Sequence, residues 1–190
     1  PNIDYSIIEA RNFITFPYLI DDQVDLVVSD FIDNEEDKVF QLAEENDLQV
    51  VKLRKDSYKI AIRKQNPLSG KEHLSSADAQ ILPLACYSGG DAAAALYFEK
   101  YFNPSLRVEF NSIEKMIRAA IEGRAVSVLP ELTIKNSLSL YSYNKDALKF
   151  LTVEGFSVAF THYLCFRKNK KQTAELNVVR NMIESLFMEL

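Results

Sequence analysis

Three segments of the sequence place small or charged polar residues where a predicted strand ends and a predicted helix begins. They are residues 9–11 (Glu-Ala-Arg), 88–91 (Ser-Gly-Gly-Asp) and 111–113 (Asn-Ser-Ile). The N-terminus of a helix presents unpaired N–H groups and partial positive charge, so it favours a carboxylate or a phosphate. Each segment also has the composition of an ordinary cap or turn. The pattern therefore predicts either anion-binding positions or simple helix starts.

Two charged side chains bear on the charge of a ligand at these positions. Arg11 offers a planar fork of donors that suits a carboxylate, and a surface salt bridge is the alternative interpretation. Asp30 ends another predicted strand, where its carboxylate would repel an anion and attract an ammonium group. An amino acid carries both groups. The predicted ligand is therefore anionic or an amino acid.

Signatures of the common enzyme classes are missing from the sequence. It contains no GxSxG elbow, no P-loop, no GxGxxG and no HExxH. The two histidines, His73 and His162, have no Cys, His or carboxylate at metal-ligand spacing, so a zinc site is not predicted. Nothing in the sequence places Ser88 beside a histidine. We predict no catalysis, no metal and no cofactor.

The composition indicates an ordinary globular protein. With 47% hydrophobic and 26% charged residues it resembles neither disordered nor membrane chains, and its apolar runs are shorter than a membrane span. A net charge of −5 argues against binding a phosphate backbone. Cys86 and Cys165 lie in apolar runs, so both are predicted to be buried free thiols in a reducing compartment.

Residues 111–131 form the clearest structural unit of the sequence. Apolar residues between Ile113 and Ile121 recur at helical spacing, with Asn111 as the predicted cap and Gly123 as the stop. Residues 125–129 then form a short apolar run typical of a buried strand, and Pro130 ends it. The segment predicts one helix followed by one strand of an α/β protein.

The remaining elements follow from periodicity and turn residues. A polar turn is predicted at residues 55–57, a loop at 66–70 and a surface loop or edge at 136–144. Strand–helix–strand alternation predicts parallel sheets. Predicted strands span residues 3–8, 25–31, 48–53, 58–62, 81–87, 106–110, 148–153 and 158–166, and predicted helices span 15–22, 74–80, 92–102 and 176–190, with Thr173 capping the last; an acidic segment from Asp33 is a helix or an insertion.

Four segments resemble the effector-binding domain of LysR-type transcriptional regulators. They are the helix–Gly–strand–Pro run at 111–131, the strand at 24–30, Asn66-Pro67-Leu68, and residues 164–169 before the last helix. Ala125 departs from the pattern, since the family usually has a second glycine there. The resemblance implies an α/β fold of two Rossmann-like lobes of the periplasmic-binding-protein type II architecture. Lobe I would comprise residues 1–68 and 163–190, and lobe II residues 69–162.

The same resemblance implies a fragment of a longer regulator. No counterpart of the family's first strand and helix is evident, and neither is a winged helix-turn-helix, so DNA would be contacted only through an N-terminal domain absent from this chain. The family commonly lines its inducer pocket, a cleft between the lobes, with residues at the strand–helix junctions and at the end of the third strand. Here the implied effector-binding residues are Arg11, Asp30, Phe31, Ser88, Gly89, Asn111 and Ser112.

The function implied is small-molecule sensing by a cytoplasmic, bacterial regulator. LysR-type proteins pair these domains antiparallel, so a homodimer or homotetramer is expected, with residues 3–8 and the helix 113–121 at the contact. A solute-binding protein of a transporter has the same bilobed fold and is the alternative. An enzyme of that fold, such as a dehydratase, is a third class. Residues upstream of Pro1 would separate these, since a basic winged helix-turn-helix selects the regulator and a signal sequence selects the transporter component.

Overall fold

A computed structural model describes residues 3–8, 12–32, 36–87, 104, 106–155, 158–170 and 173–189. The chain forms two compact units, unit 1 with Pro1–Asp56 and Ala159–Leu190, and unit 2 with Ser57–Val158. The lobe boundaries predicted from the sequence lie after residues 68 and 162. Both divisions of the structure come earlier in the chain, because the first crossing falls inside a long strand rather than in the loop at 66–70.

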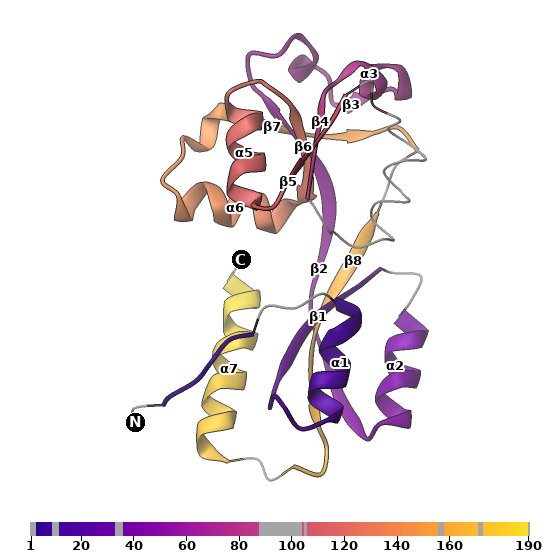
Figure 1. Ribbon diagram of the computed structural model, residues 1–190, viewed down its shortest axis with the longest axis vertical. Coiled ribbons are helices and arrows are strands. Elements are labelled where there is room, and N and C mark those ends of the chain that lie inside the picture. The colour runs from indigo at the N-terminus through magenta and orange to yellow at the C-terminus, as the bar shows by residue number, and fades with distance from the viewer. Residues whose placement is uncertain are drawn as a thin grey trace. The chain divides into compact units, whose positions relative to one another are not determined.

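Unit 1 is a small sheet with helices on both faces (Figure 1). Strand β8 lies between β1 and β2, and β1 pairs with β8 in the antiparallel direction. Helices α1 and α2 cover one face and α7 covers the other. The elements of unit 1 are α1 (Asn12–Ile20), β1 (Val27–Ile32), α2 (Glu36–Glu45), the first part of β2 (Leu48–Arg63), β8 (Ala159–Arg167) and α7 (Ala174–Glu189).

Strand β8 directs alternate side chains to the two faces of this sheet, as the pleat requires. Tyr163 and Cys165 are buried against α1 and α2. His162 and Phe166 face α7, where the His162 ring lies 5.0 Å from that of Phe187 and Arg180 lies over the Phe166 ring. The predicted cap of α7 is confirmed, because the Leu176 amide donates to Thr173 Oγ1 at 3.2 Å.

Two predictions in unit 1 are wrong. Residues 3–8 form no strand, and Ile7 is 84% exposed. A strand needs a neighbour to satisfy its backbone groups, and no described strand pairs with this segment. Helix α1 begins at Asn12, so Pro17 lies inside the helix rather than in its first turn.

Strand β2 runs without interruption from Leu48 to Arg63, although the sequence predicts two strands and a turn at residues 55–57. Asp56 lies 4.0 Å from the His162 ring, and the Tyr58 amide donates to the Val158 carbonyl at 3.1 Å. These partners are distant in sequence. The polar residues therefore continue the strand because tertiary contacts satisfy them, which local turn chemistry does not reveal.

Unit 2 contains the predicted parallel strands. Strand β4 pairs in parallel with β5 and β6, while β2 pairs antiparallel with β6 and β7. The antiparallel pairs were not predicted, because strand direction depends on which strands meet in the fold and not on local periodicity. The elements are η2 (Pro67–Gly70), β3 (His73–Leu74), α3 (Ser76–Ile81), β4 (Leu84–Tyr87), β5 (Arg107–Phe110), α5 (Ile113–Ile121), β6 (Val126–Pro130), α6 (Glu131–Leu140), η3 (Lys145–Ala147) and β7 (Leu148–Val153).

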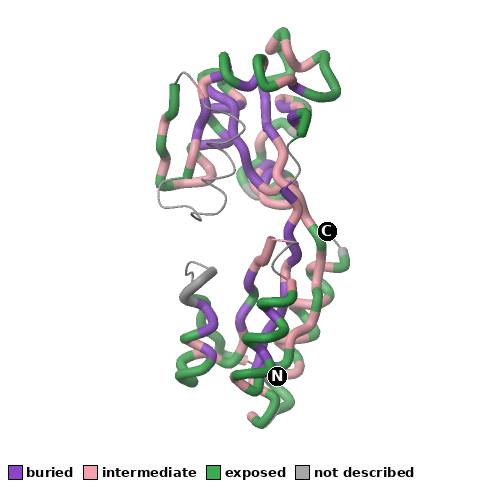
Figure 2. Tube along the Cα trace, turned by 90° about the vertical axis from the view of Figure 1, so that its right-hand side faces the viewer, coloured by how far each residue is buried: buried purple, intermediate pink, exposed green. Residues whose placement is uncertain are grey.

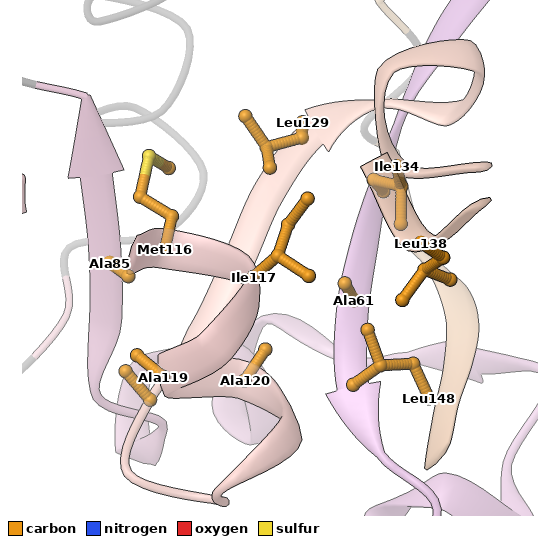
Figure 3. Close-up of a cluster of buried hydrophobic side chains, with 11 residues drawn as sticks. Ala61, Ala85, Met116, Ile117, Ala119, Ala120, Leu129, Ile134, Leu138 and Leu148 are labelled. Carbon is orange, nitrogen blue, oxygen red and sulfur yellow. The ribbon is translucent and has the colours of Figure 1, made fainter. Parts of the chain in front are cut away.

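The core of unit 2 forms around α5, as its apolar spacing predicts. Met116 and Ile117 of α5 pack with Leu129 of β6 and with Ile134 and Leu138 of α6 (Figure 3). The buried residues lie mainly along the strands and on the inner sides of the helices in each unit (Figure 2). These contacts confirm the predicted helix–strand unit at 113–130.

Helix α6 covers residues 136–140 of the segment 136–144, for which a surface loop or edge was predicted, and only residues 141–144 are non-helical. Ile134 and Leu138 lie one helical turn apart and are both buried. Serine and tyrosine dominate the rest of the segment and hide this two-residue signal. Residues 81–83 also differ from the prediction, because α3 extends to Ile81 and β4 starts only at Leu84. The predicted helix at 92–102 lies outside the described residues.

The turn at Gly123 ends α5 in the left-handed conformation, with φ of 73°. A Cβ at this position would lie 3.0 Å from Cδ of Arg63. We expect Gly123→Ala to lower the free energy of unfolding by about 1–2 kcal/mol. Gly70→Ala is the matched control, because a Cβ at position 70 meets nothing within 4 Å. Urea denaturation gives the free energy of unfolding of both variants, and an equal change in the two would contradict the prediction.

Candidate functional site

The predicted site residues that the structure describes form one pair in each unit. Asp30 and Phe31 belong to unit 1, at the end of β1, and Asn111 and Ser112 belong to unit 2, before α5. The other predicted residues lie outside the described part of the chain: Arg11, Ser88 and Gly89.

Phe31 and Asp30 point to opposite faces of β1. The Phe31 ring packs edge-on against Phe16 and Tyr163, with centroids 5.6 and 6.1 Å apart. It therefore belongs to the core beneath α1 and α2. Asp30 faces the α7 side, where His162 is its register partner on β8.

His162 joins two carboxylates on two different strands. Its Nδ1 donates a hydrogen bond to Asp30 Oδ1, and its Nε2 lies 4.0 Å from Asp56 Oδ2 on β2. The second distance is that of an ion pair rather than a hydrogen bond. We call these three residues the His162 cluster. It crosslinks β1, β8 and β2 on the face covered by α7.

The environment of His162 favours the charged ring. The side chain is 13% exposed and lies between Phe160 and Phe187, with centroids 5.1 and 5.0 Å away. Burial lowers its pKa, but the hydrogen bond to Asp30 and the contact with Asp56 outweigh burial and raise the pKa to about 9. His162 is therefore an imidazolium at neutral pH.

Sequence reasoning missed His162 and Asp56 as members of a cluster. The His162–Asp30 hydrogen bond joins residues separated by 132 positions. Two sequence features could have pointed to the cluster. His162 is a polar residue within the apolar run 158–166, and Asp56 lies in the segment 55–57 that was predicted as a turn. Neither feature indicates which residue would be the partner, so the contact between His162 and Asp56 could not be inferred from the sequence.

The second pair places an N-cap at α5, and the cap is Ser112 rather than the predicted Asn111. Ser112 has extended backbone, and its Oγ accepts from the Lys115 amide at 3.5 Å, while Asn111 is exposed. Glu114, in the first turn of α5, accepts from the Tyr143 hydroxyl at 3.4 Å. Because Asn111 is exposed and Ser112 is only partly buried, the partial positive charge of the α5 N-terminus lies close to solvent.

Ser112→Ala should lower the free energy of unfolding by about 0.5–2 kcal/mol, because the Lys115 amide loses its acceptor. Ser112→Thr retains the acceptor and is the control. Thermal and urea denaturation of both variants test this. If alanine is as stable as wild type, the hydroxyl does not act as the cap.

Both cysteines are free thiols; Cys165 is buried as predicted, whereas Cys86 is only half-buried. Burial raises the pKa of the Cys165 thiol to about 12. Burial also raises the pKa of Cys86, against the lowering effect of Arg107. A thiolate is the reactive form of cysteine, so neither environment favours redox chemistry.

Among the described residues, no group of three His, Cys, Asp or Glu side chains could hold a metal ion. None of the described helices has the length and hydrophobicity of a membrane-spanning segment.

Several solved regulatory domains are similar to this chain in fold. The reduced OxyR regulatory domain of Pseudomonas aeruginosa matches at 15% identity and TM-score 0.64, over 92% of this chain and 80% of that one. The CcmR regulatory domain of Synechocystis PCC6803, in complex with 2-PG, matches at 16% identity and TM-score 0.66, over 93% of this chain and 80% of that one. The effector-binding domain of QuiR, in complex with shikimate, matches at 16% identity and TM-score 0.63, over 97% of this chain and 81% of that one.

No curated protein sequence matches the chain. The family described as LysR substrate binding domain matches residues 1–187, which is nearly the whole sequence. The fold agrees with this match, since the two α/β units and the open mixed sheet are those of the periplasmic-binding-protein type II architecture. The chain belongs to the LysR substrate binding domain family.

Proposed function

We propose that this chain senses a small-molecule effector as the regulatory domain of a LysR-type transcription factor. The family match over residues 1–187 carries the proposal. We further propose that it works in the cytoplasm by binding without catalysis, in a homodimer or homotetramer whose N-terminal domains contact DNA. The net charge of −5 supports placing the DNA contact elsewhere than in this chain.

We also propose that the effector is an anion or an amino acid. The α5 N-terminus favours negative charge by about 0.3–1 kcal/mol, and Ser112 at its start is only partly buried. Asp30 does not oppose an anion with a full negative charge, because the His162 imidazolium is bonded to it. Shikimate, present in the related QuiR structure, is a carboxylate. The contributing residues that we propose are those predicted from the sequence, namely Arg11, Asp30, Ser88, Gly89, Asn111 and Ser112, whereas Phe31 packs in the core of unit 1.

A thermal-shift screen against amino acids, organic acids and sugar phosphates tests the proposal. A ligand that binds only the folded state at 100 times its Kd stabilises the protein by about 2.7 kcal/mol. For an amino acid that binds, calorimetry should then compare it with its deaminated acid and its decarboxylated amine. We expect the acid to bind more tightly than the amine. If the amine binds as tightly as the amino acid, the preference for an anion is wrong.

A further inference from the structure

The carboxylates of the His162 cluster differ in their access to solvent. The Asp30 side chain is 38% exposed, whereas the Asp56 side chain is 7% exposed. Asp30 lies near the end of β1, while Asp56 lies within β2 beneath the ring. Only Asp30 can therefore meet a dissolved ligand without local opening of unit 1, and its charge is the one that the ligand experiences.

The imidazole between these carboxylates is fixed on several sides. Phe160 and Phe187 enclose the ring, and Phe187 is itself held by Arg54, whose Nη1 lies 3.4 Å from the Phe187 carbonyl oxygen. The charged groups that act on the ring come from β1 and β2, namely Asp30 and Asp56. With the ring protonated, the cluster carries a net charge of −1; without a cation here it would carry −2.

We propose that His162 is a positioning residue for effector binding, which holds the Asp30 carboxylate in one orientation and reduces its negative charge so that the site accepts an anion. This deepens the proposed function and rests on it. The imidazolium does not need to touch the effector. It acts through Asp30, its register partner on the neighbouring strand.

The first experiment needs no effector. Nitrogen-15 NMR of the free domain should show both His162 ring nitrogens protonated at pH 7 and titrating near pH 9. The variant His73→Gln removes the other histidine and so assigns the signals. Asp30→Asn should lower the pKa of His162, because it removes the strongest partner of the charged ring. A neutral His162 ring at pH 7, or no response to Asp30→Asn, would overturn the proposal.

The second experiment measures charge preference. Thermal shifts are recorded for L-amino acids, their deaminated acids and their decarboxylated amines, with the wild type and with His162→Gln. We expect His162→Gln to move the acid-to-amine affinity ratio toward amines by about tenfold, and Asp30→Asn in that background to reverse the change. His73→Gln, in unit 2, should leave the ratio as in wild type. Loss of stability alone would weaken acids and amines equally.

The outcomes separate the two proposals. An unchanged acid-to-amine ratio in His162→Gln refutes the positioning role, even if effectors bind. If His162→Gln does not fold, Asp30→Asn alone must move the ratio toward acids, and a shift toward amines refutes the role. If no compound of either charge stabilises the wild type, the sensing function fails, and the positioning role, which depends on it, fails with it. The NMR result then reports only whether the cluster exists.

Discussion

Replacing His162 by phenylalanine should lower the free energy of unfolding by about 3–5 kcal/mol at pH 7. An aromatic ring is kept, although phenyl is somewhat larger than imidazole, but the Asp30 and Asp56 carboxylates lose the cation that both contact. Asp56 is nearly buried, so water cannot replace the lost partner fully. Urea denaturation at pH 7 measures the change. A loss below about 1 kcal/mol would place the cluster among ordinary surface ion pairs.

The same variant should alter the pH dependence of stability. The pKa of His162 is raised from 6.5 to about 9 in the folded state, so its contribution is complete below pH 6.5 and is lost as the pH rises to 9. The full contribution is about 3 kcal/mol. The difference in stability between wild type and His162→Phe should therefore shrink across this window. In the control variant His73→Gln, the free energy of unfolding should depend on pH as in wild type. If the difference in stability between wild type and His162→Phe stayed constant from pH 6 to 9, the assignment of the raised pKa to His162 would be wrong.

Truncating Ile134 to alanine should lower the free energy of unfolding by about 2–5 kcal/mol. The side chain is 0% exposed and packs in the core around α5. The result also tests α6 itself, since a residue in a surface loop would cost less than about 0.5 kcal/mol. Chemical denaturation gives the value.

Asn136→Ala is the matched control in the same helix. Asn136 is exposed, and alanine is the better helix former by up to about 0.7 kcal/mol. We expect the control to be as stable as wild type or slightly more so. If Ile134→Ala and Asn136→Ala changed the free energy of unfolding by the same amount, α6 would not pack against the core as described.

Sequence patterns determined the elements whose signals are local. The apolar spacing from Ile113 to Ile121 predicted α5, and the left-handed Gly123 ends it as expected. Residues 148–153 and 158–166 were recognised as strands, and Thr173 as the cap of the last helix. The resemblance at residues 111–131 led to the family that the match over 1–187 shows. Each of these signals lies within about twenty residues, the range over which periodicity and capping act.

Tertiary structure decided whatever depends on a distant partner. Residues 3–8 alternate like a strand, but the described sheet offers them no neighbour. Asp56 looks like a turn residue, yet it continues β2 because it meets His162. The charge of Asp30 was predicted to oppose an anion, and only the folded strands bring an imidazolium to it. A hydrogen bond or an ion pair depends on distance in space, and residues 132 positions apart become neighbours only when β1 and β8 pair.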